Sequence, residues 1–106
     1  MLKVTVYRDS DDRIRGFQIS GHSGYSESGS DIVCAAVSSA AYMAVNTLTD
    51  VQSLDCSIAV DDGSMKLDLS KSEAEDAQVV LNGLLLHIDA LSKEYSDFID
   101  LKISEV

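Results

Sequence analysis

The spacing of apolar residues changes twice along the chain, from every second position to every third or fourth position. Alternation with polar residues is typical of half-buried strands, whereas spacings of three and four are typical of helices. Two groups of turn-forming residues, at 9–12 and at Asp61-Asp62-Gly63, each join two alternating segments. The pattern therefore predicts two β-hairpins, each followed by a helix, and one last strand. The predicted strands are residues 2–7, 13–20, 56–60, 65–70 and 98–103, and the predicted helices are residues 31–52 and 72–96.

This ββαββαβ order is typical of the α+β class. We expect a single two-layer domain over residues 1–106, with two helices packed on one face of a mixed or antiparallel sheet whose strand order the sequence leaves open. A chain of 106 residues builds one hydrophobic core. Two local signals refine the elements. Gly16 predicts a bulge in the second strand, and Ser72 to Glu75 predict a capping box at the start of the second helix.

The charge of the chain restricts its partners. Eighteen Asp and Glu against eight Lys and Arg give a formal net charge of −10. Such a field repels phosphate backbones and anionic lipid surfaces and attracts basic ligands. We therefore expect a basic protein or peptide as partner, with no direct contact to nucleic acid and no membrane.

The first predicted helix contains an uncharged run of 18 residues, Ile32 to Thr49. Its length would suit a membrane span, but the polar residues within it favour a helix buried in the protein on more than one side. The chain shows no signal-peptide pattern at Met1 to Val4 and only two cysteines, which favours a reducing cytoplasm.

Serine and glycine dominate residues 20–30, with five serines and three of the six glycines. This composition predicts a mobile loop over residues 21–30, and a long loop in a small domain is usually functional.

One reactive side chain lies at the start of that loop, and a second follows its end. His22 follows the second strand and Cys34 lies in the first turn of the helix. A helix N-terminus favours a thiolate and offers N–H donors to an oxyanion, so Cys34 is a candidate nucleophile and His22 a candidate general base. Asp31 would orient the imidazole or, as its position favours, cap the helix. The residues alone favour a small core residue for Cys34 and a surface residue for His22 over catalytic roles.

Other chemistry is less well supported. Cys56 alternates with apolar residues, which favours core packing, and no C-x-x-C motif supports a thiol-redox role. A metal site would need His22, Asp31 and Cys34, whose spacing does not suit one. We expect neither a metal nor a cofactor.

The segment Gly21-His22, followed after six residues by Gly29-Ser30-Asp31-Ile32-Val33-Cys34-Ala35-Ala36-Val37-Ser38, resembles the signature of the ribosomal-processing cysteine protease family, called Prp. The length and element order of the whole chain also resemble that family. The resemblance implies a bacterial, cytoplasmic, homodimeric endopeptidase that removes a short N-terminal extension from large-subunit ribosomal protein twenty-seven, after an apolar segment ending in aromatic residues.

By motif position, the resemblance implies Cys34 as nucleophile, His22 as general base, Gly21 as a loop hinge and Ser38 as a residue lining the site. It leaves open whether Asp31 has a catalytic or a structural role. The alternative to an enzyme is a non-enzymatic acidic module that binds a basic ribosomal protein while Cys34 is merely buried.

Overall fold

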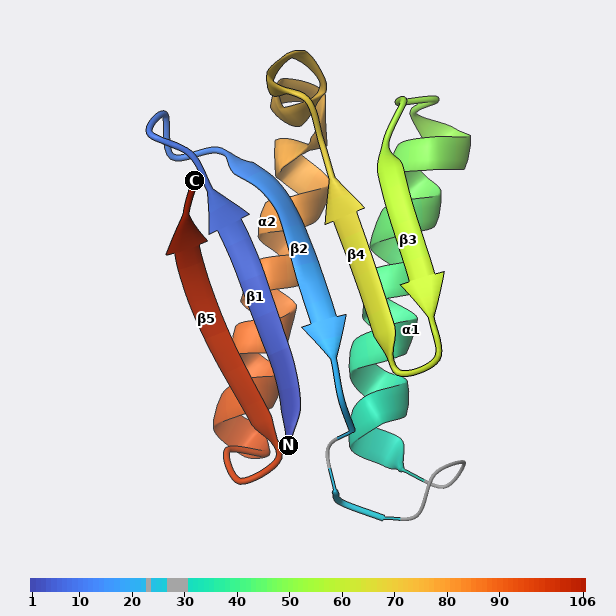
Figure 1. Cartoon of the computed structure of the whole chain (residues 1–106), viewed down its shortest axis with the longest axis vertical. Helices are drawn as coiled ribbons and strands as arrows, with labels where there is room; N and C mark the ends of the chain where they lie inside the picture. The colour runs from blue at the N-terminus through green and yellow to red at the C-terminus, as the bar shows by residue number, and fades with distance from the viewer. Residues whose placement is uncertain (23, 27–30) are drawn as a thin grey trace.

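The computed structural model shows a five-stranded mixed sheet with two helices on one of its faces (Figure 1). The structure describes residues 1–22, 24–26 and 31–106. The strands are β1 (Leu2–Arg8), β2 (Ile14–Ser20), β3 (Ser57–Asp61), β4 (Ser64–Asp68) and β5 (Ile99–Glu105). The helices are α1 (Ile32–Asn46), which continues into the π-helical turn η1 (Thr47–Val51), and α2 (Lys71–Glu94). The predicted ββαββαβ order is confirmed.

The strand order is β3-β4-β2-β1-β5. The two hairpins join through β2 and β4, which are antiparallel, and β5 pairs with β1 in parallel after the chain has crossed the sheet through α2. The sheet is therefore mixed, with β3 and β5 at its edges. This order brings the end of β2 next to the turn between β3 and β4.

The core lies between the helices and the inner face of the sheet. Phe17 and Leu67 of the central strands are at most 2% exposed, and they belong to one cluster with the inward residues of both helices. The expectation that the first helix is buried on more than one side is wrong, because Ile32 is 53% and Met43 59% exposed. A single helical layer covers the sheet, so the outer side of α1 faces away from the protein. By length and composition alone, residues 32–51 could cross a membrane, a test that core helices of soluble proteins also pass.

The predicted bulge near Gly16 is present. Tyr7 pairs with Gly16 and Arg8 with Ile14, so Arg15 is the extra residue of β2. Gly16 itself approaches β4 closely, since a Cβ atom at this position would lie 2.0 Å from the carbonyl oxygen of Leu67. The position requires glycine for lack of space.

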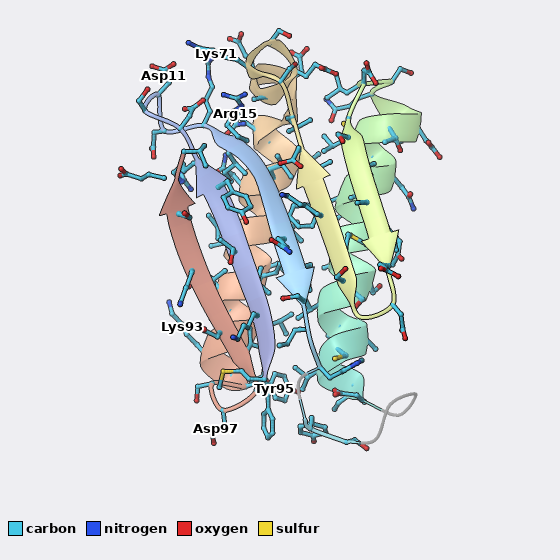
Figure 2. All side chains as sticks on the ribbon, viewed as in Figure 1. Asp11, Arg15, Lys71, Lys93, Tyr95 and Asp97 are labelled. Carbon is cyan, nitrogen blue, oxygen red and sulfur yellow. The ribbon has the colours of Figure 1, made fainter. Side chains whose placement is uncertain are left out.

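The β1–β2 turn is tied to the start of α2. The Gln78 side chain accepts from the backbone N–H of Ile14 at 2.8 Å and donates to its carbonyl oxygen at 2.9 Å. Lys71 pairs with Asp11 at 3.7 Å, and both lie at the end of the molecule opposite Tyr95 (Figure 2). The ion pair is exposed and contributes at most about 1 kcal/mol, so the hydrogen bonds of Gln78 are the stronger restraint.

The capping box of α2 begins two residues earlier than predicted. Ser70 is the N-cap: its hydroxyl accepts from the Glu73 N–H at 3.4 Å and donates to a Glu73 carboxylate oxygen at 2.6 Å. The Leu69 N–H donates to the Arg15 carbonyl oxygen, which keeps the chain extended up to the cap. That contact between distant segments selects Ser70 over Ser72.

Replacing Ser70 with alanine is expected to lower the free energy of unfolding by about 1 kcal/mol, because an N–H of the first turn loses its acceptor. Ser72→Ala is the matched control and is expected to change stability by less than about 0.5 kcal/mol. Urea denaturation measures both variants. A larger loss at Ser72 than at Ser70 would contradict the assigned cap.

Candidate active site

Asp31 caps the helix that carries Cys34. Its Oδ1 atom accepts from the backbone N–H groups of Val33 and Cys34, each at 3.0 Å, and the residue is only 8% exposed. Its extended backbone turns the chain into α1, which begins at Ile32. The capping interpretation of Asp31 is thus confirmed, and Cys34 lies in the first turn as predicted.

This cap corrects the expectation that the first N–H groups of the helix are open to an oxyanion. The N–H groups of Val33 and Cys34 donate to the Asp31 side chain, and that of Ala35 donates to the Asp31 carbonyl oxygen at 3.0 Å. The composition of a helix start does not reveal how many donors its own cap uses. The N–H groups of Val33, Cys34 and Ala35 therefore already have acceptors and are not open donors for an oxyanion.

His22 is positioned by the turn that follows β2. Gly21 has a φ of +86°, which favours glycine, and its N–H donates to the Gly63 carbonyl oxygen at 2.9 Å. This bond ties the end of β2 to the turn between β3 and β4. The exposed His22 ring lies against the same turn, since a Cβ atom added to Gly63 would lie 3.6 Å from Nε2 of His22.

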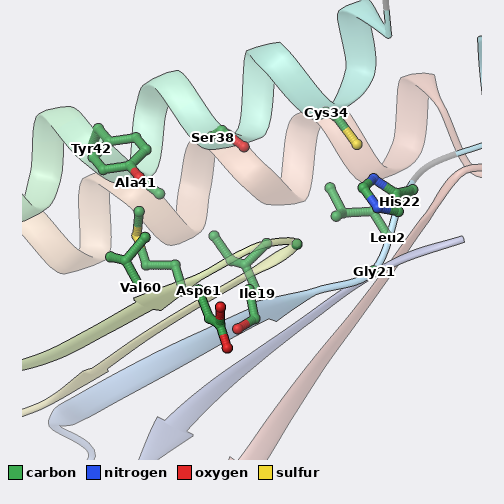
Figure 3. Close-up of a pocket in the computed structure, with 13 residues that line it drawn as sticks. Leu2, Ile19, Gly21, His22, Cys34, Ser38, Ala41, Tyr42, Val60 and Asp61 are labelled. Carbon is green, nitrogen blue, oxygen red and sulfur yellow. The ribbon is translucent and has the colours of Figure 1, made fainter. Parts of the chain in front are cut away.

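The two reactive side chains meet at one cavity. It has a volume of about 270 Å³, and Gly21, His22, Cys34 and Ser38 all line it. Figure 3 shows the Cys34 sulfur directed from α1 toward the His22 ring. Four of the five residues singled out from the sequence therefore share one site. Asp31 is not among the residues described as lining the cavity and acts on it through the cap.

The rest of the cavity wall was not predicted. Ile19, Ala41, Val60 and Met65 give it an apolar lining, and Tyr42 stands beside them on α1. A partial signal exists for the helix residues, since Ser38, Ala41 and Tyr42 follow Cys34 at helical spacing. No local signal exists for Val60 and Met65, which reach the cavity only through the sheet order.

Part of the predicted mobile loop contacts the rest of the protein. The Tyr25 ring packs edge-on against Tyr95 and Phe98, with centroids 5.9 and 5.2 Å apart. Residues 23 and 27–30 lie outside the described residues, so the mobility of residues 21–30 stays a prediction.

The second cysteine has a different environment. Cys56 is half-buried against the core, as predicted, and no disulfide joins it to Cys34. Burial raises the pKa of the Cys56 thiol, and the nearby charges of Glu73 and Asp55 raise it further. Across residues 1–22, 24–26 and 31–106, no three His, Cys, Asp or Glu side chains are grouped as metal ligands would be.

Iodoacetamide at pH 7 is expected to alkylate Cys34 faster than Cys56, by about tenfold or more, because only a thiolate reacts. The raised pKa keeps Cys56 protonated, whereas Cys34 faces an open cavity with a proton acceptor beside it. Peptide mapping of the modified protein measures both rates. Equal rates would contradict the distinction between a reactive and a packed cysteine.

Comparisons with known proteins agree over almost the whole chain. Residues 1–100 match the model of a family described as cysteine protease Prp. The chain is 28% identical to the ribosomal processing cysteine protease Prp of Bacillus subtilis (strain 168) over 103 residues, which cover 92% of each protein. It is 26% identical to the Staphylococcus aureus (strain Mu50) protein of the same name, over 95% of this chain and 97% of that one.

Solved structures give the same result. The crystal structure of the ribosomal processing protease Prp from S. aureus, in complex with a covalently linked product peptide, matches with a TM-score of 0.91 at 25% identity, covering 98% of this chain and 100% of that chain. SMU.848 from Streptococcus mutans matches with a TM-score of 0.86 at 31% identity, covering 100% of this chain and 96% of that chain.

Proposed function

The chain belongs to the Prp family of cysteine proteases, and we propose that it removes the short N-terminal extension of large-subunit ribosomal protein twenty-seven. The observation that carries the proposal is the meeting of Cys34 and His22 at one cavity, from a helix start and a strand end that are distant in the fold. The related proteins named for ribosomal processing support the class of substrate.

In the proposed mechanism, Cys34 is the nucleophile and His22 the general base. The Cys34 thiol gives its proton to the imidazole while the sulfur attacks the carbonyl carbon of the scissile bond. The C–N bond then breaks, the imidazolium gives its proton to the leaving amine, and a thioester remains on Cys34. Water that loses a proton to His22 hydrolyses the thioester and regenerates the thiol.

Other residues position these two groups. Asp31 holds the first turn of α1 and thereby the backbone of Cys34, so we assign it as a positioning residue. Gly21 is assigned as the hinge of the loop, in agreement with its positive φ. Ser38 lies one helical turn beyond Cys34 on the cavity wall and is assigned as a residue that contacts the substrate.

Charge and surface character support the proposed partners. A net charge of −10 favours encounter with a basic ribosomal protein precursor. The outer side of α1 is uncharged and exposed at Ile32, Ala35, Ser39 and Met43, which supports contact with a second copy in a homodimer. We assign the protein to the cytoplasm, where ribosomal proteins are made.

A peptide assay tests the proposal. The substrate carries the basic N-terminal segment of the ribosomal protein behind an apolar extension that ends in phenylalanine, and mass spectrometry identifies the products. We expect cleavage at one bond, after the aromatic residues, and no cleavage of a control peptide with the same composition in scrambled order. Tight binding without cleavage would instead favour the non-enzymatic module, and equal cleavage of the scrambled peptide would exclude a processing protease.

A further inference from the structure

The cavity extends from the catalytic pair to one edge of the sheet (Figure 3). Tyr42 follows Cys34 by eight residues on α1, which corresponds to about 12 Å along the helix. Tyr42, 45% exposed, and Val60 of β3, 54% exposed, stand at the far part of the cavity wall. The distance corresponds to about three or four residues of an extended peptide.

The edge reached by the cavity is a strand with one side unpaired. In the part of the chain that the structure describes, β3 pairs only with β4. Asp61 and Ser64 are opposite each other and flank a two-residue turn, so their backbone groups bond to one another, and such pairs alternate along the hairpin. Ile58 and Val60 therefore direct their N–H and C=O groups away from β4, to the unpaired side.

Edge strands are usually protected against the addition of another strand by lysine, proline or a bulge. Residues 57–60 contain no charged residue and no proline, Asp61 stands at the end of the strand, and the pairing with β4 shows no register shift. The opposite edge differs, since β5 carries Lys102 within its run. The edge beside the catalytic pair is the one that lacks these protections.

The chemistry of the cavity wall selects one part of the substrate. Val60 of β3, Met65 of β4 and Ala41 of α1 present apolar surface in this part of the cavity, and Asp61 lines it beside Val60. The proposed substrate has an apolar extension on the acyl side of the scissile bond and a basic segment on the other side. Apolar side chains of the extension suit the surface formed by Val60, Met65 and Ala41.

We propose that the apolar extension of the substrate binds as an added strand along the unpaired edge of β3. Its backbone exchanges hydrogen bonds with Ile58 and Val60, and alternate side chains enter the apolar part of the cavity between β3 and α1. Backbone pairing aligns the peptide with Cys34, and the apolar wall selects the side chains. This inference rests on the proposed function, because it specifies how that substrate is held.

Substrate peptides methylated at single backbone nitrogens test the inference without changing the enzyme. A paired strand uses every second amide, so kcat/KM is expected to fall by about tenfold at alternate amides of the extension. The intervening amides are the internal controls and are expected to change it by less than about twofold. A uniform loss along the extension, or no loss at any amide, would overturn the inference while cleavage of the unmethylated peptide upholds the proposed function.

The enzyme side is tested at Val60. Proline is tolerated in an edge strand where the N–H faces outward, so Val60→Pro removes the donor and leaves the bonds to β4 in place. Val60→Thr keeps the N–H and measures the side-chain contribution alone. We expect Val60→Pro to lower kcat/KM about tenfold below Val60→Thr, and combination with methylation of the opposing amide to cost less than the product of the two losses.

Equal activity of the two Val60 variants would overturn the inference. Circular dichroism and thermal unfolding establish that both variants fold, and if Val60→Pro does not, the methylated peptides decide alone. If the wild-type protein leaves the unmethylated peptide intact, the proposed function fails, and this inference fails with it.

Discussion

Replacing Cys34 with alanine is expected to lower kcat/KM for the extended peptide by about 10⁴-fold or more, since among the described residues that line the cavity only Cys34 carries a thiol. The variant keeps the cap of α1, because the Cys34 contact with Asp31 comes from the backbone N–H. Binding of the peptide is therefore expected to persist while cleavage is lost. Initial rates and isothermal titration measure the two quantities separately.

Cys56→Ala is the control for the loss of a thiol, and it is expected to retain activity within about twofold, because Cys56 packs on the core away from the cavity. We also expect Cys56→Ala to lower the stability of the fold modestly. Cleavage by Cys34→Ala at a rate near that of the wild type would exclude Cys34 as the nucleophile.

His22→Ala tests the other half of the pair. Loss of a general base lowers kcat/KM by about 10²–10⁴-fold. The chain has one further histidine, His87, which is exposed on α2, and His87→Ala is the matched control with expected wild-type activity. Equal effects of the two substitutions would contradict the assignment of His22.

Gly16→Ala is expected to lower the free energy of unfolding by about 3 kcal/mol, which corresponds to a fall in Tm of about 12–20 °C. The added methyl group would lie 2.0 Å from the Leu67 carbonyl oxygen, which belongs to the backbone of β4 and cannot rotate away. Relief requires β2 and β4 to separate at the centre of the sheet. Urea and thermal denaturation measure the change.

Gly83→Ala is the matched control, since a Cβ atom at Gly83 would have no neighbour within 4 Å. Gly83 lies in the interior of α2, where alanine is favoured over glycine by about 1 kcal/mol, so this variant is expected to be more stable than the wild type. Similar effects of the two substitutions would show that glycine at position 16 is not required by the close approach of β4.

Local patterns predicted the elements because each depends on near neighbours in the chain. The alternation around Asp62-Gly63 predicted the β3–β4 hairpin, and the spacing from Val33 onward predicted α1. The bulge beside Gly16 was likewise a local signal. Errors arose where two local solutions compete: Ser70 and Ser72 both offer a cap, and the bond from Leu69 to Arg15, 54 residues away in the chain, selects the first.

The candidate site likewise has features that the sequence predicted and features that only the structure shows. The motif identified Cys34, His22 and Asp31, because a nucleophile, a base and a helix start can be recognised from residue type and spacing. It did not show that the Asp31 cap uses the N–H groups of Val33 and Cys34, since a side chain can act as a cap or point elsewhere with the same sequence. The uncharged sequence of α1 also did not reveal that its outer side is exposed, because an uncharged helix face suits both the core and an interface.

The sequence by itself determined the α+β class and the element order, which depend on backbone periodicity and short-range spacing, and its resemblance to a family motif named Cys34 and His22 as candidate site residues. Only the tertiary structure decided the strand order, which places Val60 and Met65 on the same cavity as Cys34 and leaves β3 unpaired at the edge beside it. The physical reason is that hydrophobic burial is non-directional. It drives each amphipathic element onto the core, whereas the choice of neighbours depends on close contacts between distant segments, such as Gly16 against Leu67.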